Sequence, residues 1–96
     1  MDEDLIHKAL SSRFRRQVLV WLKNPGGSHP EGITSAGLSG REIEALGGLA
    51  QSTTSGHLKL LSLAGLVSVR RQGQTAIYSR NEEMIARFVA NAATCL

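Results

Sequence analysis

Nine consecutive positions, 51–59, hold the side chains best suited to hydrogen-bond chemistry. They read QSTTSGHLK and carry hydroxyl, amide, imidazole and ammonium groups but no carboxylate. Ser, Thr and Gly are weak helix formers, and Gly costs about 1 kcal/mol relative to Ala, so helix stability alone does not favour them. Small donors and acceptors without negative charge suit a helix that reads base edges in a DNA groove. The residues we expect to face DNA are Gln51, Ser52, Thr53, Ser55, Gly56, His57 and Lys59.

The start of this segment also has a simpler interpretation. Ser52 or Thr53 could be the N-cap of an ordinary solvated helix. His57 could belong to a DNA-binding face or be a structural residue. The residues that follow favour the DNA interpretation.

A helix followed by a basic hairpin is predicted from position 51 onward. Leu58, Leu61 and Ala64 recur on one helix face. After Gly65, the runs 66–69 and 75–78 alternate like short strands, and RRQGQ between them forms a basic tip. This order indicates a winged helix, a mainly α fold with a small β-hairpin. The tip residues expected to contact the DNA backbone or minor groove are Arg70, Arg71 and Gln74.

The preceding residues supply the first helix of a helix-turn-helix. Ser39 and Glu42 have the spacing of a capping box, which predicts a helix over 40–46. Gly47-Gly48 then form the turn, and Leu49 is expected to pack back under it. Upstream, 24–32 reads as a loop, and Ile33-Thr34 is a candidate third strand against the wing.

Helices are also expected at both ends of the chain, which gives about five helices, a two- or three-stranded wing and one domain over 1–96. Asp2-Glu3-Asp4 suit the start of the first helix, Ser11 or Ser12 caps the second, and Asn81 caps the last. A chain of this length has little core in which to bury two further apolar stripes. We therefore expect a homodimer whose interface comprises Leu5, Ile6, Ala9, Ile85, Phe88, Val89 and Ala92.

The charge distribution fits a polyanionic partner. The net charge is +3, and positions 41–80 contain Arg41, Lys59, Arg70, Arg71 and Arg80 against two glutamates. Double-stranded DNA with an inverted-repeat operator is the expected partner. For Arg13 and Arg16, farther upstream, a solvated helix face is favoured over DNA contact.

Several stretches together resemble the ArsR/SmtB family of bacterial winged-helix repressors. They are LAQSTTSGHLKLL at 49–61, AGLV at 64–67, RQG at 71–73 and Tyr78, with weaker matches at Ala9-Leu10 and Arg15. The resemblance covers most of the chain except 24–36, and it departs at Gly56, where the family usually has a larger, often basic residue. It implies a DNA-binding transcriptional repressor.

The resemblance also raises metal sensing, which this sequence does not support. Many relatives bind metal through cysteines on the first helix of the helix-turn-helix, or through Asp and His on the terminal helix. Here 41–46 contains neither Cys nor His, and the last helix contains no His. Three dispersed histidines and one cysteine do not form a soft-metal site. We expect no metal and no cofactor, and the sequence does not identify a small-molecule inducer.

No catalytic constellation is recognisable, so we expect no enzyme activity. Cys95, the only cysteine, is interpreted as an incidental thiol in preference to a thiol sensor or an intermolecular disulfide. No apolar run is long enough to span a membrane, and a cytoplasmic protein is expected. The alternative function is a winged-helix protein-interaction module without DNA binding, which the uncharged to basic face at 51–59 disfavours.

Overall fold

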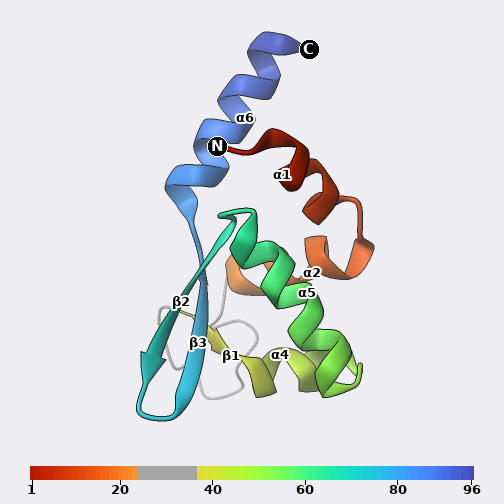
Figure 1. Cartoon of the computed structure of the whole chain (residues 1–96), viewed down its shortest axis with the longest axis vertical. Helices are drawn as coiled ribbons and strands as arrows, with labels where there is room; N and C mark the ends of the chain where they lie inside the picture. The colour runs from red at the N-terminus through yellow and green to blue at the C-terminus, as the bar shows by residue number, and fades with distance from the viewer. Residues whose placement is uncertain (24–36) are drawn as a thin grey trace.

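A small sheet lies at one side of the helices, and α5 (Gln51–Leu63) runs through the middle of the domain (Figure 1). The computed structural model describes residues 1–23 and 37–96. Within these ranges the predicted winged helix-turn-helix fold is confirmed, with five helices and three strands. The elements are α1 (Glu3–Leu10), α2 (Arg13–Lys23), β1 (Leu38–Ser39), α4 (Gly40–Gly47), α5 (Gln51–Leu63), β2 (Val67–Gln72), β3 (Thr75–Arg80) and α6 (Glu82–Cys95).

Short polar side chains set the starts of four helices. Asp2 and Asn81 each accept a backbone N–H in the first turn of α1 and α6. Ser12 accepts one from α2 at 3.3 Å. Ser39 and Glu42 form the predicted capping box of α4, in which each side chain accepts from the other residue's backbone. These caps satisfy N–H groups that have no partner within the helix.

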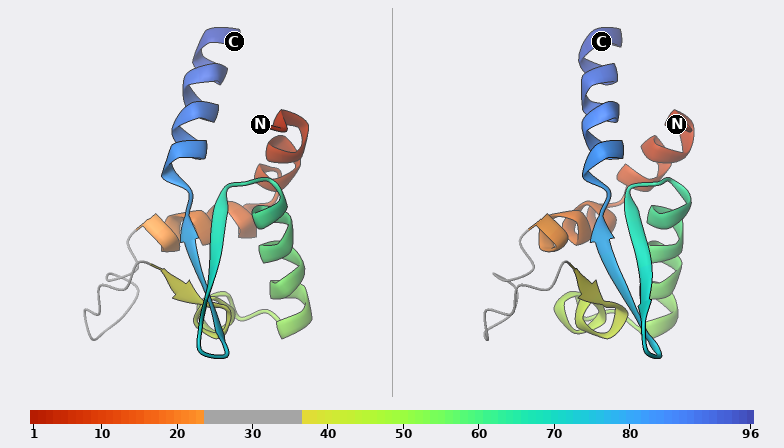
Figure 2. Two further views of the ribbon diagram at one scale, coloured as in Figure 1. Left: turned by 60° about the vertical axis from the view of Figure 1, so that its left-hand side comes forward. Right: turned by 90° about the vertical axis from the view of Figure 1, so that its left-hand side faces the viewer.

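The hydrophobic core lies between α5 and the helices behind it, and Figure 2 shows α2 and α4 crossing beside the sheet. The predicted face of α5 is confirmed, because Leu58, Leu61 and the adjacent Ala64 are buried. Phe14 and Trp21 of α2 pack against the edge of this core with their rings at 79°. The buried hydrophobic residues are Ile6, Ala9, Val18, Leu19, Leu22, Leu38, Ile43, Leu58, Leu61, Ala64, Leu66 and Val67.

The wing is a tight hairpin with a two-residue turn. Gln72 pairs with Thr75 in the β2–β3 register, which leaves Gly73-Gln74 as the turn. Gly73 has a φ of +66°, and the φ of Gln74 is not positive. A type II′ turn requires this combination. Arg70 and Arg71 therefore lie in β2, and the prediction that they form the hairpin tip was wrong.

The third strand is β1, and the sheet order is β1-β3-β2 with antiparallel pairing. Leu38 pairs with Tyr78. The predicted third strand at Ile33-Thr34 lies outside the described residues. Gly37, immediately before β1, lies so close to β3 that a Cβ there would overlap the Tyr78 carbonyl. Only glycine allows the two backbones to approach in this way.

Two predictions about packing were wrong. Ile6 and Ala9 are fully buried within the protomer, so they are not available to a partner subunit. The core reaches α1 because α1 packs on α5, which the sequence pattern of α1 does not reveal. Leu49 is 36% exposed and does not pack under the turn. Helix α6 has no buried residue and extends away from the domain (Figure 1).

Two glycine substitutions should shift stability in opposite directions. Gly37→Ala should lower the free energy of unfolding by about 1–3 kcal/mol, because β1 must move away from β3. Gly56→Ala should raise it by about 0.5–1 kcal/mol, because Gly56 is helical and a Cβ there meets no atom within 4 Å. Urea denaturation of both variants measures the difference. Equal shifts of the two midpoints would contradict the close approach at Gly37.

Candidate nucleic-acid interface

The rotation of α5 about its axis is set by three buried residues. Thr54, Leu58 and Leu61 face the core at spacings of four and three. Most of the other side chains of the first two turns therefore point outward. The exposed residues there are Gln51, Ser52, Thr53, Ser55, Gly56 and Lys59, six of the seven expected to face DNA.

The N-terminus of α5 is open. Ala50 is its N-cap, and no side chain of the described residues caps the helix. Ser52 and Thr53 lie inside the helix, so the alternative that one of them is the N-cap was wrong. The first N–H groups of α5 and the positive end of its dipole are consequently left for solvent or an anionic ligand.

His57, the seventh residue, turns toward the domain. Its Nδ1 lies 2.9 Å from an Arg15 Nη1, and its ring is tilted on Phe14 with centroids 4.8 Å apart. Guanidinium nitrogens only donate, so Nδ1 accepts and carries no proton. Burial and, second, the Arg15 charge lower the pKa of His57 below its usual 6.5. Of the two interpretations of His57, the structure favours the structural one.

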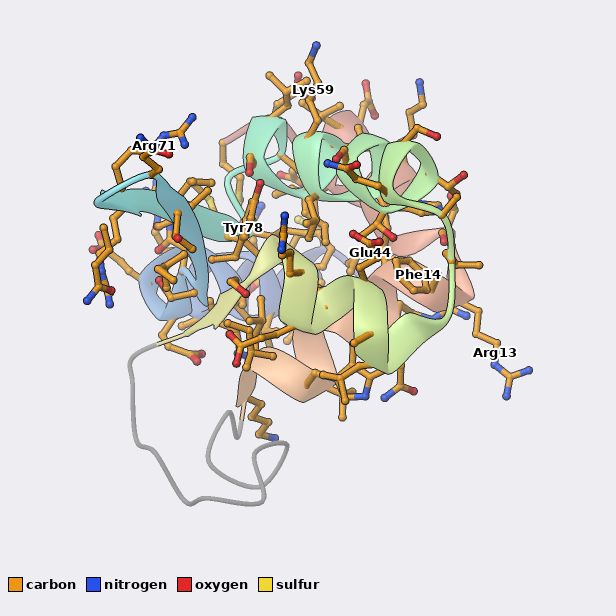
Figure 3. The ribbon with its side chains drawn as sticks, turned by 90° about the horizontal axis from the view of Figure 1, so that it is seen from below. Arg13, Phe14, Glu44, Lys59, Arg71 and Tyr78 are labelled. Carbon is orange, nitrogen blue, oxygen red and sulfur yellow. The ribbon has the colours of Figure 1, made fainter. Side chains whose placement is uncertain are left out.

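The wing places its basic residues beside α5. Arg70, Arg71 and Gln74 are exposed, and Arg71 Nη1 donates to the Gln74 carbonyl at 3.5 Å. Figure 3 shows Lys59 of α5 and Arg71 of the wing on the same side of the domain, whereas Arg13 points out at the opposite end. Two cationic elements therefore border one surface.

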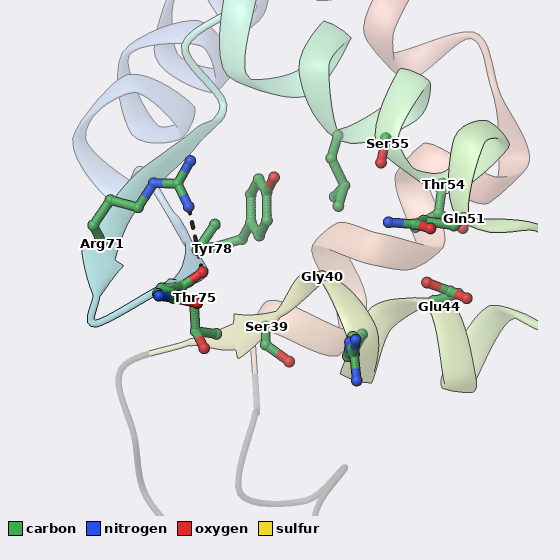
Figure 4. Close-up of a pocket in the computed structure, with 13 residues that line it drawn as sticks. Ser39, Gly40, Glu44, Gln51, Thr54, Ser55, Arg71, Thr75 and Tyr78 are labelled. Carbon is green, nitrogen blue, oxygen red and sulfur yellow. Dashed lines mark hydrogen bonds between the residues drawn. The ribbon is translucent and has the colours of Figure 1, made fainter.

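Between α4, α5 and the wing lies a groove of about 530 Å³ (Figure 4). Its lining includes four residues of the predicted site, namely Gln51, Ser55, Arg71 and Gln74. It also includes residues that the sequence analysis did not assign to the site. These are Ser39, Gly40, Arg41, Glu44, Thr54, Leu58, Thr75, Ala76 and Tyr78.

A signal for part of this lining was present in the sequence. Ile43 is the buried residue of α4, and on so short a helix its burial places Arg41 and Glu44 on other faces. Tyr78 could not be assigned in the same way, because its place in the groove depends on the pairing of β3 with both neighbouring strands. In Figure 4, Glu44 and Gln51 lie across the groove from Arg71.

The described residues contain no group of three His, Cys, Asp or Glu side chains that could hold a metal ion. Cys95 is an exposed free thiol near the end of α6. None of the described helices is long and apolar enough to cross a membrane.

Comparison with known proteins identifies a relative of this chain. The chain is 37% identical over 86 residues to the HTH-type transcriptional regulator YbzH of Bacillus subtilis, itself uncharacterised, and the match spans 85% of this chain and 86% of YbzH. The chain belongs to the HTH-type transcriptional regulators. No protein-family model matches it.

Solved structures place this regulator in the winged fold of the ArsR family. The crystal structure of an ArsR family transcriptional regulator superposes with a TM-score of 0.78 at 19% identity, over 98% of this chain and 91% of that one. The homodimeric winged helix-turn-helix domain of a possible ArsR-family regulator from Mycobacterium bovis gives 0.70 at 24% identity, over 96% and 76%. The resemblance found in the sequence is confirmed.

The His57 contact predicts an acid-sensitive stability of the regulator. Because the pKa of folded His57 is lowered, the unfolded chain binds more protons below about pH 6.5. The stabilisation is therefore complete above that pH and is lost as pH falls through the lowered pKa. Urea unfolding between about pH 7.5 and pH 5 should show a steeper loss for wild type than for His57→Gln, which cannot protonate. Parallel profiles would contradict the assignment of Nδ1 as an acceptor.

Proposed function

We propose that this chain is a sequence-specific DNA-binding regulator of transcription, a homodimeric repressor and not an enzyme. The observation that carries the proposal is the exposed surface of α5, without an acidic side chain, beside the basic wing. Such a surface complements the phosphate backbone and leaves small polar groups next to base edges. A protein-binding module has no need for this combination.

The two elements have different roles in this proposal. The start of α5 enters the major groove, where Gln51, Ser52, Thr53 and Ser55 reach base edges. Gly56, with open space around its Cα, lets the helix lie close to the DNA. The open N-terminus of α5 and Lys59 meet phosphates. On the wing, Arg70, Arg71 and Gln74 contact the backbone or the minor groove.

The position of α6 supports a dimer. Val89 on this helix is 59% exposed, and Ile85, Phe88 and Ala92 are only partly buried. Phe88 already packs on α1 through an edge contact with His7 at 5.4 Å, so Val89 is the most accessible of the set. The M. bovis domain named above is described as homodimeric. Two-fold pairing would cover the α6 stripe, together with Leu5, and would match an inverted-repeat operator.

Loss of a base contact and loss of a wing contact should have different effects on DNA binding. With a duplex selected by the wild type, Gln51→Ala should cost about 1–3 kcal/mol and relax sequence preference. Arg70→Ala should weaken binding to all duplexes and reduce the slope of log affinity against log salt by about one per lost phosphate contact. Fluorescence anisotropy at several salt concentrations measures both. Arg87→Ala, which removes an exposed cation from α6, is the control and should leave the slope unchanged.

Two results would contradict this proposal or a part of it. Wild-type protein that binds no selected or genomic duplex at low salt would exclude DNA as its partner. Unchanged sequence preference in Gln51→Ala would instead mean that another element reads the bases.

The dimer has its own test. Val89→Asp places a charge in the proposed interface and should yield monomers that bind the operator far more weakly, although α5 is untouched. Ala90→Asp makes the same chemical change at the next exposed position of α6, away from the stripe, and should remain dimeric. Sedimentation at micromolar concentration separates the two. A wild-type monomer that still binds its operator tightly would contradict the dimer.

A further inference from the structure

One side chain of α2 connects α1 to α5. Arg15 Nε donates to the Ala9 carbonyl at 2.8 Å, and one Nη donates to the Lys8 carbonyl at 3.0 Å. The other Nη donates to His57 Nδ1 at 2.9 Å. Carbonyls in the last turn of a helix lack partners within that helix. Arg15 helps to satisfy this end of α1, where Ser11 also donates to the Lys8 carbonyl, while it holds α5. Three contacts leave its guanidinium little rotational freedom.

His57 receives this contact in the middle of the proposed DNA-binding segment. Gly56 on one side of it and Lys59 two positions beyond are exposed, whereas His57 points inward. Its other neighbour is Phe14, whose ring lies so close to Gly47 of α4 that a Cβ at Gly47 would overlap it. The imidazole is therefore in contact with a cluster that joins α1, α2, α4 and α5.

The surroundings of the imidazole determine how it responds to a proton. From α2 it faces the Arg15 cation and the Phe14 ring. Through Arg15 it is linked to backbone carbonyls of α1, and the adjacent part of α4, Gly47, is uncharged. A proton on Nδ1 would remove the acceptor and place two cations next to each other.

We propose that Arg15 and His57 are positioning residues for DNA recognition, and that they fix the orientation of α5 against α1 and α2 so that the exposed residues of 51–59 meet the base edges together. Protonation of His57 releases this contact and weakens DNA binding. The inference rests on the proposed DNA-binding function. It adds to that function a pair of residues that do not themselves touch DNA.

Arg15→Lys tests the geometry without a change of charge. Lysine keeps the cation but cannot make three directed hydrogen bonds from one planar group. DNA affinity, measured by anisotropy with a duplex selected by the wild type, should fall about tenfold, within the range of coupling seen for contacting residues. Arg13→Lys makes the same change at an exposed position of α2 and should bind like wild type. Circular dichroism at the assay temperature establishes that each variant is folded.

The pH profile separates positioning from a merely structural role. His57→Gln keeps an acceptor and cannot protonate, and His7 and His29 are the same in both proteins. The ratio of the two Kd values, wild type over variant, should rise as the pH falls from about 7.5 to about 5.5, by less than about tenfold because the pKa of folded His57 lies below 6.5. If Arg15→Lys does not fold, this comparison alone decides.

The outcomes distinguish the two proposals. Wild type that binds no duplex overturns the proposed function and this inference with it. Wild type that binds DNA while folded Arg15→Lys binds equally well, or while His57→Gln shows the same pH profile, overturns the inference and leaves the proposed function standing.

Discussion

The burial of one narrow face of α5 is the constraint on which the rest of the structure depends. Leu58 and Leu61 are almost completely buried, and Thr54 is 2% exposed. These residues allow only one rotation of the helix, so they also decide which polar side chains point away from the core. Helix α5 is thus a core element and a surface element at once. Its neighbours α1, α2 and α4 supply the apolar partners, while the wing extends the exposed side.

On that exposed side, the sequence of α5 is poorly suited to helix formation. It has no side-chain N-cap among the described residues, whereas Asp2, Ser39 and Asn81 cap three other helices. It also carries Gly56 in its interior, at a cost of about 1 kcal/mol relative to Ala. Because α5 is anchored by burial, it tolerates this loss. The start of α5 is uncapped, small and polar, so the rest of the fold must hold it in place. Such departures from local helix preference are expected at functional sites.

Local periodicity was sufficient to predict the order of the helices and of the two hairpin strands, because the repeats of 3.6 and 2 and the caps lie within each segment. It did not predict β1 at Leu38–Ser39. The hairpin tip and the N-cap of α5 were errors of one or a few positions at the ends of elements. The errors of packing concern contacts between distant segments. Ile6 and Ala9 form the same apolar stripe whether the protomer or a partner subunit covers it. Only the packing of α1 on α5 shows that the protomer itself does so. The direction of His57 depends on Arg15, 42 positions away. Arg41, Glu44 and Tyr78 share a groove only once α4 and β3 are placed.

Arg80 connects the wing to α6, the helix of the proposed dimer interface. Its side chain, 15% exposed, donates to the Leu19 carbonyl of α2 at 3.1 Å and to the Glu82 carboxylate at 2.8 Å, and this hydrogen bond lowers the pKa of Glu82. The Glu82 pair is largely exposed and stabilises little. The Leu19 contact joins Arg80 to α2, and it acts beside Met84, Ile85 and Phe88, which pack the start of α6 against the core. The largely buried Arg80 side chain therefore ties the end of the wing to α2 at the point where α6 begins. In a two-fold dimer built on α6, that junction sets how far apart the two α5 helices lie, and successive major grooves require about 34–36 Å.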